Sequence, residues 1–200
     1  MTKQIKIVVY IGVMGSGKDY QAHKLITNQN YVKVAFADEV RKDLWKLIGW
    51  EPKTEQAYED FKNHKFVNLD GSTYTGRDLL QRYGTNIRRE EDENVWARKT
   101  VQTLKKHIKS GLTKFVITDC RFENEVEYLK QFNIQNKNID VEFRNCNYKS
   151  DRYNISSKHE SEKFGQTFRN WEDNDKYFDV LIYSNKWYEL FEDEFKYLKL

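Results

Sequence analysis

Eight consecutive residues near the start of the chain have the composition of a loop that binds phosphate. Residues 12–19 read Gly-Val-Met-Gly-Ser-Gly-Lys-Asp, which fits the pattern G-x-x-x-x-G-K followed by a small polar residue. Glycine tolerates positive φ angles, so backbone N–H groups in such a loop can turn inward around an anion. We therefore predict that a nucleoside triphosphate is held by Gly12, Gly15, Ser16, Gly17 and Lys18, with the lysine on the outer phosphates.

Asp19 departs from the usual pattern, in which a Ser or Thr hydroxyl binds Mg²⁺ at this position. A carboxylate can also bind Mg²⁺, directly or through water, because this ion prefers hard oxygen ligands. Asp19 could therefore be a metal ligand, cap the start of the following helix, or pair with a Lys or Arg.

A second group with chemical potential reads Thr-Asp-Cys-Arg at residues 118–121. Asp119 ends an apolar strand pattern, where a Walker B carboxylate would hold the magnesium shell. It could instead cap a helix that begins at Glu123. Arg121 could face a phosphate, or pair with Glu123 or Glu125.

The elements that must position these residues alternate along the chain. Strand patterns occupy residues 5–11, 31–37, 114–118, 139–144 and 179–183, and helix patterns occupy 18–28, 40–48, 77–83, 95–110, 123–132 and 186–200. This alternation predicts a parallel α/β sheet with right-handed crossovers, in which ligands bind beyond the carboxyl ends of the strands. The residues at or just beyond such ends are Gly12, Asp38, Asp119 and Arg144. Asp38 can also cap the helix expected at 40–48.

Two segments interrupt the alternation. Residues 50–75 are irregular and contain the only proline, Pro52, and an Asp-Gly turn signal at 70–71. Residues 145–175 are mostly polar, with aromatic residues scattered among them. We expect one domain over residues 1–200, with an acceptor-side insertion at 50–75 and a lid-like segment at 145–175.

Composition limits the compartments and partners that fit. The net charge of +3 combines 34 basic and 31 acidic residues, so the balance favours neither nucleic acid nor membrane as a partner. The first apolar run, residues 7–11, is far too short to cross a bilayer. Two cysteines in 200 residues suit a reducing compartment. We expect a cytoplasmic protein.

Four segments, in order and spacing, resemble the bacteriophage deoxynucleoside monophosphate kinases, within the nucleoside monophosphate kinase group. The loop resembles that family's loop, which also carries Gly-Lys-Asp. Residues 77–85 (RDLLQRYGT) are similar to its R-x-x-L-Q-x-x-G-T segment, and residues 116–121 (VITDCR) to its strand-D-x-R segment. Residues 159–162 (HESE) are similar to its H-x-S/T-E segment.

The resemblance implies a three-layer P-loop kinase fold with a mainly five-stranded parallel sheet and inserted lid and acceptor-binding segments. It implies transfer of the γ-phosphoryl of ATP to a deoxynucleoside 5′-monophosphate, with Mg²⁺ near Asp19 and Asp119. If the gene is phage-encoded, the protein would act in the host cytoplasm, and a homodimer is an open alternative to a monomer.

Roles follow for individual side chains under this resemblance. Arg41, one helical turn beyond Asp38, would meet the acceptor phosphate; Arg77 could fork a phosphate while Gln81 reads the base or sugar. Arg144 or Arg152 could close over the transferring group. The remaining residues expected to contact substrate are Asp38, Asp119, Arg121, His159 and Glu162. The alternative for each arginine is a surface ion pair, the role expected for Arg82, Arg88, Arg89 and Arg98. Three aromatics could stack a base or simply fill the core: Tyr74, Trp96 and Phe122.

Two other functions compete. One is a different small-molecule P-loop kinase, acting on dephospho-coenzyme A or on ribonucleotides. The other is a nucleotide-dependent switch or ATPase, whose output is binding and not transfer.

Overall fold

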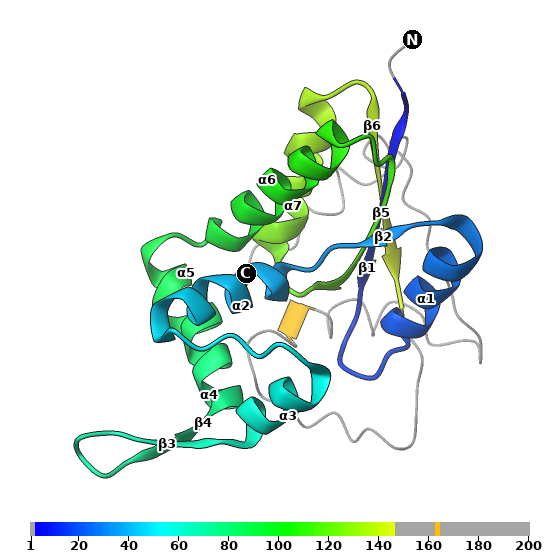
Figure 1. The fold of residues 1–200 in the computed structure, drawn as a ribbon. Coiled ribbons are helices and arrows are strands. Elements are labelled where there is room, and N and C mark those ends of the chain that lie inside the picture. The colour runs from blue at the N-terminus through cyan, green and yellow to red at the C-terminus, as the bar shows by residue number, and fades with distance from the viewer. Residues whose placement is uncertain (1–2, 147–162, 165–200) are drawn as a thin grey trace.

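The computed structural model describes residues 3–146 and 163–164. Their core is a four-stranded, all-parallel sheet in the order β2-β5-β1-β6 (Figure 1). The strands are β1 (Ile5–Ile11), β2 (Val32–Lys33), β5 (Lys114–Cys120) and β6 (Ile139–Asn145). The predicted parallel α/β sheet is confirmed over these four strands. The fifth strand expected at 179–183 lies outside the described residues.

The central strand β1 is buried on both faces, as its β-branched sequence predicts. Ile7 and Val9 pack into one apolar cluster, whereas Val8 and Tyr10 pack into another on the opposite face. The first cluster includes side chains of α2 (Phe36–Ile48), α6 (Val95–Lys109) and α7 (Glu123–Gln135). The second holds α1 (Lys18–Gln29). Helices therefore cover both faces of the described sheet.

The segment expected to be an irregular insertion contains regular structure. It forms α3 (Glu55–Asn63) and an antiparallel hairpin of β3 (Lys65–Val67) and β4 (Thr73–Thr75). The hairpin extends away from the sheet (Figure 1). A third apolar cluster of Leu44, Trp45 and Phe61 holds α3 against α2.

Between the hairpin and α6 the chain forms three short helical pieces. They are α4 (Gly76–Gln81), the π-helical segment η1 (Arg82–Ile87) and α5 (Arg88–Glu91). A capping box begins α4, because Thr75 Oγ1 accepts from the Asp78 amide at 3.2 Å and Asp78 Oδ2 accepts from the Thr75 amide at 2.8 Å. The helix expected at 77–83 is therefore shorter, and passes into a wider turn.

The second predicted strand and the cap predicted after it are both wrong in detail. Only Val32–Lys33 pairs with the sheet, and the helix begins at Phe36, four residues before the expected start. Asp38 lies inside the first turn and does not cap it. The reason is a distant carboxylate, since Asp119 accepts the amides of Phe36 (3.1 Å) and Ala37 (2.8 Å). A cap supplied from β5 cannot be recognised by local sequence patterns.

Within residues 3–146 and 163–164, no helix is both long and apolar enough to cross a membrane.

Candidate active site

The predicted phosphate loop joins β1 to α1 at the carboxyl end of the central strand (Figure 1). Its three glycines have positive φ angles: 143° at Gly12, 78° at Gly15 and 87° at Gly17. A side chain on Gly12 would also collide with the carbonyl oxygen of Cys146, at the end of β6. Glycine is therefore required at Gly12 both by backbone conformation and by space.

Lys18 lies inside this loop. Its ammonium group donates to the carbonyl oxygens of Gly12 (2.6 Å) and Val13 (2.5 Å) and lies 3.3 Å from the Ser16 hydroxyl. The residue is 6% exposed. The loop thus holds one buried cation at its centre.

Asp19 is exposed and pairs with Lys33 of β2, at 2.9 Å. Burial acts to raise the pKa of Asp19, but hydrogen bonds from Lys33 and Thr118 and the charge of Lys18 outweigh it, so the pKa is lowered. The structure therefore shows the ion-pair alternative for this residue. The carboxylate stays charged beside the loop, so it also suits a hard cation.

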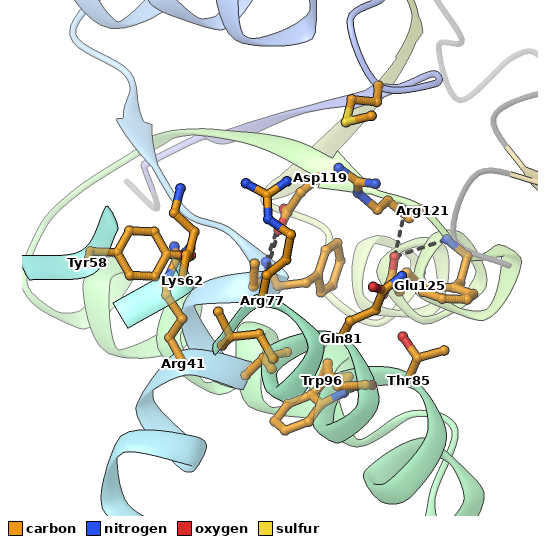
Figure 2. Close-up of a pocket in the computed structure, with 17 residues that line it drawn as sticks. Arg41, Tyr58, Lys62, Arg77, Gln81, Thr85, Trp96, Asp119, Arg121 and Glu125 are labelled. Atoms are coloured by element: carbon orange, nitrogen blue, oxygen red, sulfur yellow. Dashed lines mark hydrogen bonds between the residues drawn. The ribbon is translucent and has the colours of Figure 1, made fainter. Parts of the chain in front are cut away.

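Next to the loop lies a pocket of about 580 Å³ (Figure 2). Met14 at the tip of the loop is one of its walls, so loop and pocket share an edge. The charged and polar side chains that line the pocket are Arg41, Tyr58, Lys62, Arg77, Gln81, Thr85, Asp119, Arg121 and Glu125. Figure 2 shows Lys62, Arg77 and Arg121 extending from different elements into one end, with Gln81, Thr85 and Trp96 at the other.

Helix α4 and the segment after it supply one side of this pocket. Arg77 and Gln81 both line it, four residues apart, as the motif at 77–85 predicts. Thr85, from the same motif, lines it through η1. Gly84 packs against Val40 and its carbonyl accepts the Trp96 indole N–H at 2.7 Å.

Asp119 lies in β5 and lines the pocket from the sheet side. Its burial raises the pKa of the carboxyl, although the amides of Ala37 and Phe36 act in the opposite direction. The predicted alternative was a cap on the helix at Glu123; the structure shows a cap on α2. Each carboxylate oxygen accepts one amide in this role and can accept a further hydrogen bond. Asp119 can therefore cap α2 and still contact a ligand in the pocket.

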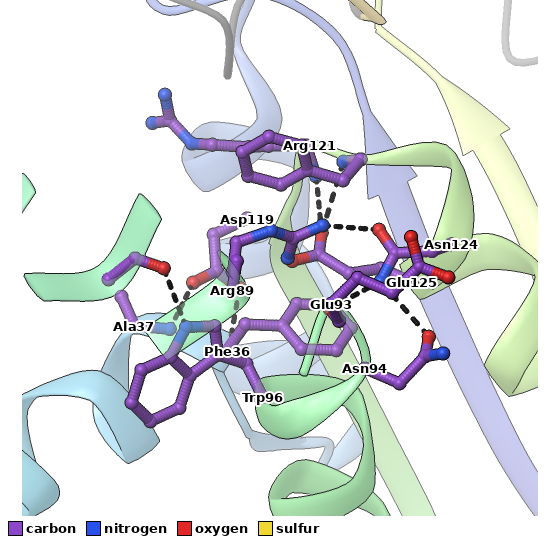
Figure 3. A network of polar contacts seen from close by, with 12 residues as sticks. Phe36, Ala37, Arg89, Glu93, Asn94, Trp96, Asp119, Arg121, Asn124 and Glu125 are labelled. Atoms are coloured by element: carbon purple, nitrogen blue, oxygen red, sulfur yellow. Dashed lines mark hydrogen bonds and ion pairs between the residues drawn. The ribbon is translucent and has the colours of Figure 1, made fainter. Parts of the chain in front are cut away.

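The start of α7 is capped by Glu125, which lies in the first turn of this helix. Its Oε2 accepts the amides of Arg121 (2.8 Å) and Phe122 (3.1 Å), and its other oxygen pairs with Arg89 at 3.3 Å (Figure 3). Burial raises the pKa of Glu125 to about 7, against the effect of the Arg121 amide and the Arg89 charge. This network fixes the turn that carries Arg121 into the pocket.

Arg89 was expected to be a surface side chain, and that expectation is wrong. Its side chain is 11% exposed, and the guanidinium lies 3.7 Å from the centre of the Phe122 ring. It also donates to Asn124. Arg88 pairs with Glu91 and Arg98 with Asp92, as expected. Arg82 instead lies over the Tyr74 ring, 4.6 Å from its centre.

Several predicted site residues lie elsewhere. Arg144 pairs with Glu142 at 2.7 Å and donates to Tyr10 Oη at 3.2 Å, and it does not line the pocket. Asp38 pairs with Arg41 but is not itself a wall. Three further candidates lie outside the described residues: Arg152, His159 and Glu162.

Sequence reasoning missed several walls of the pocket. Lys62 and Tyr58 belong to the segment treated as irregular, and nothing in the local pattern marks them. Met14 lies inside the phosphate-loop motif and Glu125 lies four residues after the Thr-Asp-Cys-Arg motif, so proximity to those motifs was the available signal. Among the aromatics proposed to stack a base, Tyr74 lies on the hairpin and Trp96 is 2% exposed. Trp96 and Phe122 both line the pocket, and Phe122 is half-buried.

No group of three or more His, Cys, Asp or Glu side chains within the described ranges is arranged to hold a metal ion. Mg²⁺ needs fewer protein ligands, since it commonly uses one or two carboxylates together with phosphates and water. Asp19 is charged and lies within hydrogen-bond reach of the Thr118 hydroxyl, so it offers carboxylate oxygens of the kind that Mg²⁺ prefers.

Comparisons with known proteins give one distant relative in sequence. No family model matches the chain. A protein of Acanthamoeba polyphaga mimivirus, named "Putative deoxynucleotide monophosphate kinase", is 28% identical over 140 residues, which are 62% of this chain and 69% of that protein.

A comparison of structures gives a chain from the Pnkp1/Rnl/Hen1 complex. It matches with a TM-score of 0.35 and 13% identity over 80% of this chain. The match spans 44% of that chain, less than half its length.

Proposed function

We propose that the protein transfers the γ-phosphoryl group of ATP to a (deoxy)nucleoside 5′-monophosphate. The observation that carries this proposal is the pocket lined by Arg41, Lys62, Arg77 and Arg121, which meets the phosphate loop at Met14. A site for a triphosphate and a site for a second anion are then neighbours. The name of the mimivirus relative supports the same reaction class.

The chemistry requires positioning and charge neutralisation more than a strong base. The acceptor phosphate is already an anion, so no proton has to be removed before attack. The two phosphate groups repel each other, and cations must hold them in line. Lys18 would hold the donor, while Arg77 and Arg41 hold the acceptor. Arg121 would neutralise charge between them.

Mg²⁺ would be held by Asp19, by Asp119, or by both through water, and when bound it would neutralise phosphate charge. The residues of this chain contribute oxygen ligands and a charged Asp19 at neutral pH. Glu125 and Asp119 both engage backbone amides, which fixes the pocket wall before substrate arrives. Preorganised walls lower the cost of orienting two anions.

The test is an ADP-release assay with ATP, Mg²⁺ and each deoxy- and ribonucleoside monophosphate in turn. We expect ADP release only when an acceptor is present, and loss of it in Lys18→Ala. Lys24→Ala, an exposed lysine on the same helix, is the matched control and should keep full activity. ATP consumption that is independent of every acceptor would overturn the proposal and favour a switch or ATPase. Transfer to dephospho-coenzyme A but to no nucleotide would also overturn it.

A further inference from the structure

Two cations of the pocket come from helices whose backbones touch. Lys62 follows Phe61 in α3, and Arg77 follows Gly76 in α4. The Gly76 amide donates to the carbonyl of His64 at 3.0 Å, and a Cβ on Gly76 would collide with the Phe61 carbonyl. The absence of a side chain at Gly76 lets the two helices approach so closely that Lys62 and Arg77 point into the same opening (Figure 2).

The support beneath Lys62 is rigid. Phe61 is fully buried, and its ring packs edge-on against Trp45 at 4.6 Å and against Trp50 at 5.2 Å. The Lys62 side chain itself is only 18% exposed, so its stem is held while its ammonium reaches the pocket. A cation held in place loses less entropy when it binds an anion than a freely moving surface lysine does.

The Tyr58 ring makes cation–π contacts with two cations of the pocket. The Lys62 ammonium lies 4.8 Å from the ring centre and the Arg41 guanidinium 5.4 Å from it, and Arg41 also donates to Tyr58 Oη at 3.3 Å. The electron-rich face of an aromatic ring attracts cations at these distances. Tyr58 therefore lowers the cost of holding two positive charges close together.

One cation of this region, Arg77, is not neutralised by a carboxylate of the described residues. Asp38 pairs with Arg41 and Glu59 with Lys62, while Arg77 forms no ion pair with any residue in the described part of the chain. The two carboxylates that line the pocket, Asp119 and Glu125, already accept backbone amides. Lys62, Arg77 and Arg121 extend into the same end of the pocket, so this end suits a ligand group with two negative charges, such as a phosphate monoester.

We propose that Lys62 and Arg77 form a clamp for the 5′-phosphate of the acceptor, with Tyr58 as a positioning residue that holds Lys62. This deepens the proposed function and rests on it. The acceptor-side segment then selects phosphorylated acceptors over free nucleosides, because only the former supply the charge that the clamp neutralises. Lys62 would be a contact to substrate that the sequence motifs did not indicate.

The test compares Lys62→Met, which keeps the length of the side chain without its charge, with Lys62→Arg, which restores the charge. We expect Lys62→Met to raise KM for the best monophosphate by about tenfold or more with little change in KM for ATP. Lys62→Arg should recover most of the loss. Lys65→Met, an exposed lysine on β3, is the control and should match wild type. Tyr58→Leu, which removes the ring beneath Lys62, should raise KM for the monophosphate more than Tyr58→Phe, which keeps the ring and loses only the hydroxyl that accepts from Arg41.

Calorimetric binding of inorganic phosphate and of the four deoxynucleoside monophosphates separates the clamp from the proposed reaction. If wild type transfers phosphate but Lys62→Met has unchanged KM and phosphate affinity, the clamp is wrong and the proposed function stands. If wild type transfers to no monophosphate, the proposed function fails. In that case, phosphate binding that is lost in Lys62→Met and kept in Lys65→Met would still support an anion clamp.

Discussion

At the scale of single residues, the site is built by charges that are held before any ligand binds. Lys18 is fixed by loop carbonyls, and Arg41 by Asp38 and Tyr58. Arg77 differs, since it is exposed and unpaired within residues 3–146 and 163–164. A side chain with no structural partner can be removed with little damage to the fold, so its substitution reports on ligand binding.

Arg77→Ala should therefore raise KM for the acceptor monophosphate by roughly 10- to 100-fold, the range for a lost charge-assisted hydrogen bond, while the melting temperature stays near that of wild type. Steady-state kinetics and thermal unfolding measure the two effects. Arg98→Ala is the control, because this arginine pairs with Asp92 away from the pocket. It should change neither the KM for the acceptor nor the KM for ATP. An acceptor KM equal to that of wild type would remove Arg77 from the site.

Glu125 gives a prediction about pH. Its pKa of about 7 is above the ordinary value of 4.5, so between these values the folded protein binds a proton that the unfolded chain does not. The stability that this proton contributes is fully present below pH 4.5 and is lost as pH rises through 7. Glu125→Gln removes this titration. As pH rises from 5 to 7, the free energy of unfolding of wild type should therefore fall relative to that of Glu125→Gln, by up to about 3 kcal/mol.

Denaturant unfolding at pH 5, 6, 7 and 8 measures this difference. Glu127→Gln, on the exposed side of the same helix, is the control, and its curve should run parallel to that of wild type. Parallel curves for Glu125→Gln as well would show that Glu125 has no raised pKa in the folded protein.

At the scale of elements, sequence patterns predicted most helices and strands. They did not predict contacts in which one element caps or positions another that is far away in the sequence. The bounds of β1 were predicted correctly, because a β-branched apolar run that ends at glycine is a strong local signal. The start of α2 was missed, because its first amides are satisfied by Asp119, 82 residues or more away. Lys62 was missed for a similar reason, since its place depends on contact between Phe61 and Gly76.

Asp119→Ala tests the cap across elements. Ala35 precedes α2 and offers no side-chain acceptor, so loss of the carboxylate leaves two amides without their partner. We expect the free energy of unfolding to fall by about 1–2 kcal/mol, the usual value of a helix cap, even in EDTA. Asp140→Ala on β6 is the control and should cost less. Unfolding of Asp119→Ala identical to wild type in EDTA would mean that the carboxylate serves only a ligand or metal.

At the scale of the whole molecule, the described sheet brings the candidate groups to one edge. Alternating strands and helices predicted that convergence, and the carboxyl ends of β1 and β5 carry the loop and Asp119. The partners of each charge could not be predicted, because they depend on packing between segments far apart in the sequence. The segment expected to form a lid, residues 145–175, falls almost entirely outside the described residues, so the expectation of closure over the site stays a prediction.

The shared edge at Met14 predicts how a two-ended ligand binds. An adenosine joined through five phosphates to the nucleoside of the best acceptor monophosphate should bind at least about 100-fold more tightly than ATP, because one binding event brings the second group to its site. Calorimetry measures the affinities. Lys18→Ala and Lys62→Met should each weaken the analogue, and Lys65→Met should not. An analogue that binds no better than ATP would show that the loop and the pocket do not act together.

The cap on α2 has a consequence for local opening. Amides in the first turn of a helix normally exchange their hydrogens quickly, because they have no partner within the helix. The amides of Phe36 and Ala37 instead donate to a carboxylate that is part of a central strand. Deuterium should therefore enter these two positions about as slowly as it enters β5, and the start of α2 should open only when the sheet itself does.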